Sequence, residues 1–145
     1  EMVAAGRLGE AEAGALLLDG AAWFLDTELG RFIRARAEDV HREVAFVWSV
    51  PPEQCDPAVV GQDHRDVVLV RGMVDLLLTT GNSLLILDYK TDRVEPSGCA
   101  ERAETYRGQL DHYAAAMHGI WNWPVTQRPL VFLYARQIVD LGPIC

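Results

Sequence analysis

Two aspartates and one lysine stand in apolar surroundings where charged side chains are unusual. Asp75 lies in one apolar run of the sequence, and Asp88 and Lys90 lie in the next. A charge in such surroundings loses its hydration and persists only when it is paired or bound to a metal ion. Carboxylate oxygens suit Mg²⁺ or Mn²⁺, which keep several waters and share other positions with substrate phosphate. These groups could therefore support metal-assisted hydrolysis of a phosphodiester.

The segment between the two apolar runs predicts a hairpin that brings the three residues together. Gly81 suits a two-residue turn because glycine accepts the positive φ required there. The resulting register places Asp75 opposite Asp88, with their Cβ atoms about 4.5–5.5 Å apart on one face of the sheet. Lys90 lies two residues beyond Asp88, so it points to the same face. An ordinary ion pair between Lys90 and one of the aspartates is the structural alternative.

The rest of the chain predicts the elements that position this hairpin. Apolar positions at helical spacing predict two or three short helices within residues 6–39, and period-two alternation predicts a strand over 43–48 that ends at Pro51. The remaining expected elements are a loop (53–65), two hairpin strands (67–79 and 83–92), a helix (99–122) and a final strand pair (130–134 and 137–141). This order predicts a mixed α/β fold with a central mixed β-sheet flanked by helices.

Composition and charge restrict the classes of function. The 145 residues predict one domain, and no apolar stretch is long enough to cross a membrane. The net charge of −8 argues against a general nucleic-acid-binding surface. Lys90 is the only lysine, since every other basic residue is arginine. Three cysteines, Cys55, Cys99 and Cys145, are too few and too far apart for a zinc or iron–sulfur site and indicate a reducing compartment, so we expect a cytoplasmic protein.

Three motifs occur in order along the chain: GxxD at 72–75, DYKTD at 88–92 and QxxxY at 109–113. Over residues 42–141 this pattern resembles the C-terminal nuclease domain of the AddAB and RecBCD helicase-nucleases, a branch of the PD-(D/E)xK superfamily. The resemblance implies a restriction-endonuclease-like core and Mg²⁺-dependent cleavage of DNA. It also implies a single nuclease domain over 1–145, with a helical lead-in (1–39) and the nuclease core (40–145).

The resemblance assigns roles to individual residues. It implies that Asp75 and Asp88 ligate Mg²⁺, for which Mn²⁺ can substitute, and that the main-chain carbonyl of Tyr89 adds a ligand. Lys90 then positions or activates the attacking water. Gln109 and Tyr113 match the motif that supports the site from the following helix, and their i, i+4 spacing puts them on one helix face. Tyr106, three residues before Gln109, accompanies the QxxxY motif and lies on the same helix face. Packing in the core is the alternative for both tyrosines.

The sequence departs from the family pattern at one motif. A G-x-x-x-H string that carries a histidine metal ligand does not occur before Asp75, so we expect this ligand to lie upstream of Glu1 or to have been lost. The implied partners are DNA, a UvrD-like helicase region of the same polypeptide and a second helicase-nuclease subunit, in double-strand-break repair. A cleavage-dead module for DNA binding or subunit docking is one alternative, and a stand-alone nuclease is another.

Overall fold

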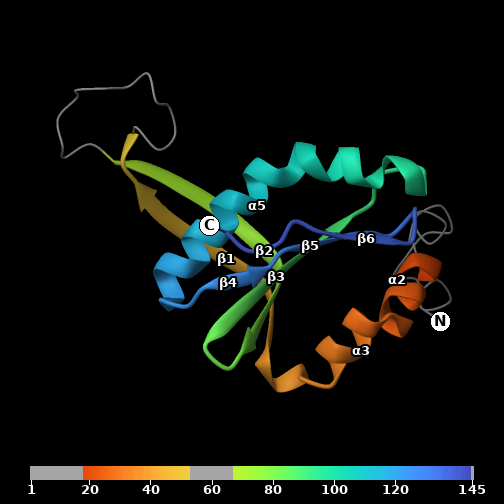
Figure 1. Ribbon diagram of the computed structural model, residues 1–145. Helices are drawn as coiled ribbons and strands as arrows, with labels where there is room; N and C mark the ends of the chain where they lie inside the picture. Colours follow the sequence, from red (N-terminus) through yellow and green to blue (C-terminus); the bar gives the residue numbers. More distant parts are fainter. Residues whose placement is uncertain (1–17, 53–66, 145) are drawn as a thin grey trace, which may run out of the picture.

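A computed structural model describes residues 18–52 and 67–144 (Figure 1). Three helices and six strands follow one another in the described chain. They are α2 (Leu18–Asp26), α3 (Glu28–Arg34), β1 (Val40–Val50), β2 (Val68–Thr80), β3 (Ser83–Lys90), α5 (Cys99–Trp121), β4 (Val125–Gln127), β5 (Pro129–Phe132) and β6 (Gln137–Asp140), with short 3₁₀ helices at Ala37–Asp39 and Pro96–Gly98. The predicted mixed α/β class is confirmed.

The sheet is mixed, as expected. Its strand order is β1-β2-β3-β5-β6, and β4 pairs with β3 beside this path. The pairs β1–β2, β2–β3 and β5–β6 are antiparallel, whereas β3 runs parallel to both β4 and β5. A parallel pair needs a long crossover connection, and α5 forms that connection between β3 and its parallel partners.

Helices cover both faces of the central strand β3 (Figure 1). Leu84 and Ile86 point into a core cluster shared with α5, while Leu85 and Leu87 point into a second cluster shared with α2 and α3. A strand buried on both faces reads as a continuous apolar run instead of an alternating one. The two apolar runs of the sequence therefore mark the middle of the sheet.

The long helix α5 approaches the sheet closely because it presents small residues. Ala103, Ala114 and Ala116 are fully buried, and Gly119 lies directly under the ring of Trp48. The helix ends at Asn122, which adopts a left-handed conformation with φ 55° and donates its N–H to His118 O at 2.8 Å. The predicted helix over 99–122 is confirmed to within one residue.

Several predicted boundaries were wrong. β1 extends from Val40 to Val50 beyond the predicted 43–48, because polar residues on its exposed side hide the pattern at both ends. β3 stops at Lys90, two residues early, and the three-residue strand β4 was not predicted because it is too short to show a period. The predicted loop over 53–65 and the first part of the predicted helical segment 6–39 lie outside the described residues.

Arg128 is a charged side chain that is only 2% exposed. Its guanidinium forms an ion pair with Asp111 on α5. It also donates to the main-chain oxygens of Leu141 (3.2 Å), Gly142 (2.8 Å) and Pro143 (3.3 Å). A buried charge is tolerated when its donors are satisfied in this way. Arg128 thus fastens the segment after β6 to the core.

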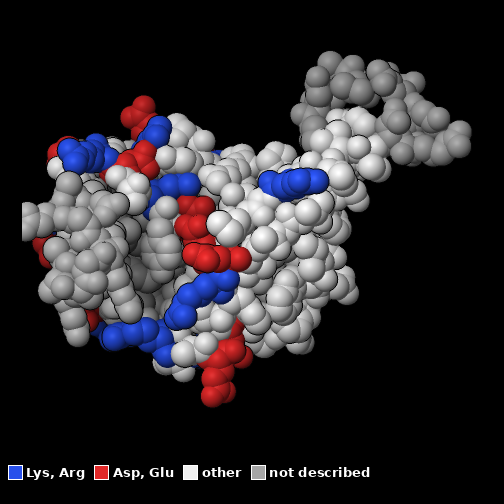
Figure 2. Space-filling model, turned by 180° about the vertical axis from the view of Figure 1, so that it is seen from behind, with Lys and Arg blue, Asp and Glu red and all other residues white. Residues whose placement is uncertain are grey.

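The face drawn in Figure 2 carries acidic and basic side chains intermixed in one band, beside a broad uncharged surface. Val47 of β1 and Leu69 and Met73 of β2 are apolar side chains that are exposed. On this face, the described residues therefore form no continuous basic surface. Separately, none of the described helices has the length and apolar character that a membrane span requires.

Candidate active site

The sheet divides at the two aspartates. Backbone pairing between β2 and β3 begins at Thr80↔Ser83, as the turn predicted, and ends at Leu76↔Leu87. Beyond this point β2 continues along β1, while β3 pairs with β5 from Asp88 onward (Figure 1). The first residues past the fork are Asp75 on one strand and Asp88 on the other.

The side chain of Asp75 accepts a hydrogen bond from the backbone of β3 at the point where β2 and β3 are no longer paired. Its Oδ2 accepts the main-chain N–H of Tyr89 at 2.8 Å, across the opening between β2 and β3. The side chain of Tyr89 packs on the far face, edge-on to Phe24, with 5.5 Å between ring centroids. The predicted register is confirmed up to Leu76, but Asp75 and Asp88 are not a backbone pair of the ladder.

β1 is irregular at the same level as Asp75. Glu43, the residue between the paired residues Arg42 and Val44, has a φ of 52°, which is unusual for a residue with a side chain. Val40 before it packs in the cluster on the α2–α3 side, whereas Val44 after it packs in the cluster on the α5 side. The strand therefore changes the face that it buries beside the fork.

Asp88 is buried, with 4% of its surface exposed. Burial raises the pKa of its carboxyl and the charge of Asp75 raises it further, while Lys90 opposes both effects through a hydrogen bond and its charge. The net pKa lies above the ordinary value for aspartate. A divalent cation bound at this point would offset the repulsion that the charge of Asp75 exerts on the Asp88 carboxylate.

Lys90 connects β3 to α5. Its side chain is 12% exposed, and its Nζ lies 2.7 Å from Asp88 Oδ2. The same ammonium donates to Gln109 Oε1 at 3.2 Å and lies 3.8 Å from the centre of the Tyr106 ring. The structure therefore brings Lys90, Asp88 and Gln109 together, as the sequence predicted.

Gln109 and Tyr113 continue this row along α5. Gln109 Nε2 donates to the Tyr113 hydroxyl at 2.8 Å, so the predicted i, i+4 neighbours are in contact. The Tyr113 ring packs edge-on against Phe46 of β1, with 5.5 Å between ring centroids. A Cβ on Gly72 would lie 2.6 Å from Phe46 Cζ and 2.8 Å from Tyr113 Cε1, so only glycine fits beneath these rings. Gly72 of the GxxD motif therefore leaves the space that the ring of Tyr113 of the QxxxY motif occupies.

The donor set fits Mg²⁺ better than a transition metal. Across residues 18–52 and 67–144, no three His, Cys, Asp or Glu side chains gather at one point to hold a metal ion. Asp75 and Asp88 offer two carboxylates at the fork. Mg²⁺ is commonly bound by one or two carboxylates with water in the remaining positions, whereas a zinc site needs three or four protein ligands.

Sequence reasoning placed Tyr106 on the helix face of Gln109 and Tyr113, but it did not predict the contacts of Tyr106 behind Lys90. The Tyr106 hydroxyl lies 2.9 Å from both carboxylate oxygens of Asp92. Arg102 binds Asp92 Oδ1 through NH2 at 2.6 Å and through Nε at 2.9 Å. Burial alone would raise the pKa of Asp92, but the hydrogen bonds from Arg102 and Tyr106 lower it below the ordinary value. The i, i+4 spacing of Arg102 and Tyr106 was a usable signal, but their common partner Asp92 was not foreseeable.

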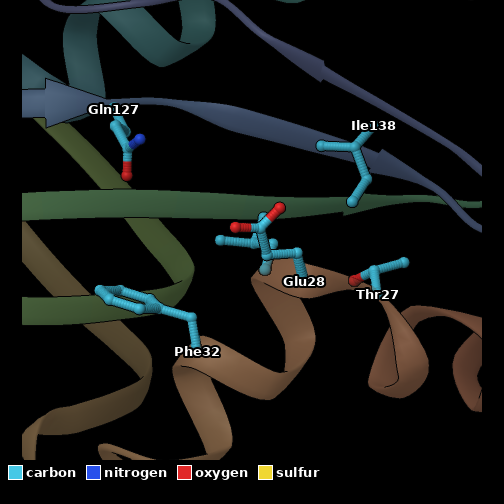
Figure 3. Close-up of a pocket in the computed structure, with 6 residues that line it drawn as sticks. Thr27, Glu28, Phe32, Gln127 and Ile138 are labelled. Carbon is cyan, nitrogen blue, oxygen red and sulfur yellow. The ribbon is translucent and has the colours of Figure 1, made fainter.

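A separate pocket of about 520 Å³ lies on the other side of the sheet. Figure 3 shows Glu28 and Phe32 of α3 facing Gln127 of β4 and Ile138 of β6. None of the residues that line it belongs to the row from Asp88 to Tyr113. The candidate chemistry therefore lies at the fork, on the α5 side.

Comparison with known proteins identifies the family of the chain. A family model described as "PD-(D/E)XK nuclease superfamily" matches residues 4–139. A protein of Lacticaseibacillus casei (strain BL23), described as a subunit of an ATP-dependent helicase/nuclease, is 38% identical over 118 residues, covering 81% of this chain and 9% of the relative. Proteins with the same description are 40% identical over 114 residues in Desulforudis audaxviator (77% of this chain, 9% of the relative) and 29% identical over 147 residues in Lactobacillus delbrueckii subsp. bulgaricus (97% and 12%).

These relatives are much longer than the matched region, since the chain spans 9% to 12% of their length. The family model, in contrast, covers nearly the whole chain. Its match includes the fork, the ion pair of Lys90 and the row of side chains on α5. The chain belongs to the PD-(D/E)XK nuclease superfamily.

Proposed function

We propose that this chain is a nuclease domain that hydrolyses phosphodiester bonds of DNA with Mg²⁺. The observation that carries the proposal is the fork of the sheet, where Asp75 and Asp88 are the first residues past the last β2–β3 pair and the ammonium of Lys90 lies 2.7 Å from Asp88 Oδ2. Carboxylates and an ammonium at one point are the groups that metal-assisted hydrolysis of a phosphodiester requires.

Each residue of the site has a distinct role in this proposal. Asp75 and Asp88 hold the cation, together with the main-chain carbonyl of Tyr89. When bound, Mg²⁺ supplies a Lewis acid that activates water and neutralises charge developing on phosphorus. Lys90 orients the attacking water and a phosphate oxygen. Gln109, itself held by Tyr113, keeps the ammonium of Lys90 directed into the site.

The relatives also support a proposal for the polypeptide and the assembly to which this domain belongs. Their description as one subunit of an ATP-dependent helicase/nuclease supports a polypeptide with a helicase region and a second subunit. We propose that residues 1–145 form the single nuclease domain of such a polypeptide and that it acts on DNA in the cytoplasm during double-strand-break repair. DNA binding by the rest of the assembly would explain how an acidic domain with a net charge of −8 reaches its substrate.

The decisive experiment replaces Asp88 in the full-length protein. Asp88→Asn removes a charge with little change in volume, and relief of the burial cost should keep the fold intact. Cleavage of linear DNA with Mg²⁺, with and without ATP, should fall by about 100-fold or more. Asp19→Asn is the matched control, because its side chain is 93% exposed and lies away from the fork.

Metal binding gives an independent measurement of the same site. Calorimetry with Mn²⁺ should detect a site in the parent that Asp88→Asn weakens and Asp19→Asn leaves unchanged. Cleavage by Asp88→Asn at the parent rate would mean that the reaction takes place elsewhere. A parent that binds DNA but does not cut it under any of these conditions would contradict the proposal in favour of a docking or DNA-binding module.

A further inference from the structure

We propose that Tyr106 is a positioning residue for Lys90, acting through the face of its ring. This inference rests on the proposed nuclease function, because the position of the ammonium matters only if Lys90 takes part in cleavage. From its spacing, Tyr106 shares the helix face of Gln109 and Tyr113, but the sequence assigns it no role in the site. Its ring nevertheless lies closer to the ammonium than a typical cation–π contact requires, at 3.8 Å from the ring centre.

The contacts of Lys90 leave one side of its ammonium for the ring. A lysine ammonium has three donors and no acceptor. Among the described side chains, two oxygen partners accept from it, Asp88 Oδ2 at 2.7 Å and Gln109 Oε1 at 3.2 Å. The face of the Tyr106 ring covers the ammonium from α5, and the Lys90 side chain is accordingly only 12% exposed. The ring thus contributes an attraction that involves no hydrogen-bond acceptor.

The hydroxyl of Tyr106 is hydrogen-bonded to Asp92 and Arg102, and we call these contacts the clamp. Asp92, two residues after Lys90, lies 2.9 Å from that hydroxyl through each carboxylate oxygen. Arg102 binds the same carboxylate and also donates to the Tyr106 hydroxyl at 3.0 Å. These hydrogen bonds join α5 to the chain just after β3. The ring itself also packs against the core cluster on the α5 side, so its position does not depend on the hydroxyl alone.

The ring matters because Asp88 has two competing partners. In the structure Asp88 is the nearest partner of Lys90, yet the proposed function also requires this carboxylate to hold a divalent cation. A cation bound to Asp88 weakens its attraction for the ammonium, since both positive charges share one negative charge. The Tyr106 ring attracts the ammonium through its quadrupole, and a cation on Asp88 does not compete for that attraction. Tyr106 and Gln109 then keep Lys90 in place.

Two substitutions separate the ring from its hydroxyl. Tyr106→Phe keeps the ring and loses the clamp, whereas Tyr106→Leu removes the ring. In the full-length protein with Mg²⁺, the single-turnover cleavage rate of Tyr106→Phe should stay within about three-fold of the parent, and that of Tyr106→Leu should fall about ten-fold. DNA affinity measured with Ca²⁺ should be unchanged in both. Tyr134→Leu is the control, since Tyr134 is an exposed tyrosine outside the site.

A second measurement does not depend on cleavage. Acetylation of Lys90 by a dilute amine-reactive reagent, followed by mass spectrometry of its peptide, reports how well the ammonium is covered. Tyr106→Leu should be labelled several-fold faster than the parent, while Tyr106→Phe and Tyr134→Leu should match it. If Tyr106→Leu fails to fold, Tyr106→Met fills a similar volume with a flexible side chain and replaces it in both measurements.

The outcomes distinguish this inference from the proposed function. A parent that does not cleave, or an Asp88→Asn variant that does, overturns the nuclease assignment. If the parent cleaves and Asp88→Asn does not, then parent-like cleavage and labelling by a folded Tyr106→Leu overturn the role of Tyr106 alone. A loss in Tyr106→Phe as large as that in Tyr106→Leu also overturns it, because the hydroxyl and not the ring face would then be the active element.

Discussion

The helix that carries Tyr106, Gln109 and Tyr113 depends on a close contact between Gly119 and Trp48. A Cβ on Gly119 would lie within 2.8 Å of three ring atoms of Trp48, and real Cβ atoms essentially never approach within 3.0 Å. Gly119→Ala therefore forces the indole or the end of α5 to move. Gly108 in the same helix is the matched control, because a Cβ there would meet nothing within 4 Å.

The magnitude follows from two opposing effects. Replacing glycine by alanine inside a helix stabilises a protein by about 1 kcal/mol. Overpacking a well-packed contact costs about 1–3 kcal/mol. Gly108→Ala should therefore raise the free energy of unfolding by about 1 kcal/mol. Gly119→Ala should gain at most the same stabilisation, and the overpacking should lower its free energy of unfolding. The free energies of unfolding of the two variants should therefore differ by about 1–3 kcal/mol.

Urea and thermal unfolding of the two variants, measured side by side with the parent, test this difference. For a domain of this size, 1 kcal/mol corresponds to about 2–4 °C in Tm, so the variants should be separated by about 2–12 °C. The slope of the urea transition should not change, because the exposed area on unfolding is the same. If Gly119→Ala is as stable as Gly108→Ala, Trp48 does not pack over this glycine and the account of how α5 reaches the sheet is wrong.

Three other substitutions test separate parts of the structure. Lys90→Arg should abolish DNA cleavage by the full-length protein but retain Mn²⁺ binding. The reason is that a broad planar guanidinium cannot take the place of an ammonium enclosed by Asp88, Gln109 and Tyr106. Retained cleavage would make Lys90 a structural partner only. Arg128→Met should lower the free energy of unfolding by about 2–4 kcal/mol in urea, since main-chain oxygens after β6 lose their donor, and a change below about 0.5 kcal/mol would contradict this role. Asp92 has a lowered pKa in the folded chain, so its contribution to stability is present at neutral pH and is lost as the pH falls below about 4. Urea unfolding at pH 7 and pH 3 should therefore show a smaller acid-induced loss in Asp92→Asn than in the parent, and equal losses would refute the contribution of this group.

Local features of the site were predictable from the sequence. The turn at Gly81 sets the register from Ser83 to Leu87, because a two-residue turn leaves no freedom in the pairing of adjacent residues. The contact of Gln109 with Tyr113 follows from helix geometry in the same way. Both features depend on residues close together in the chain, whose relative positions are determined once the element is known.

The features that were missed depend on residues far apart in the chain. The fork at Asp75 exists because β3 exchanges β2 for β5 as its partner, and β5 follows β3 only after the whole of α5 and β4. The partners of Arg128 come from α5 and from the segment after β6. Tyr106 reaches Lys90 only because α5 crosses the sheet at one particular place. No periodicity in the sequence predicts these long-range contacts, since each depends on how whole helices and strands pack against one another.

The burial of Arg128 has a consequence for the order of events while the chain is being made. Arg128 is synthesised before the residues whose main-chain oxygens it needs, at Leu141, Gly142 and Pro143. A nascent chain that ends before them cannot bury this guanidinium without leaving donors unsatisfied, which is costly. Arg128 therefore becomes fully hydrogen-bonded beside β5 and β6 only after residues 141–143, whose main-chain oxygens accept from it, have left the ribosome. We expect a ribosome-stalled chain that lacks these residues to be protease-sensitive at β5 and β6. A chain that contains them, extended by a linker long enough to fill the exit tunnel, should be protected.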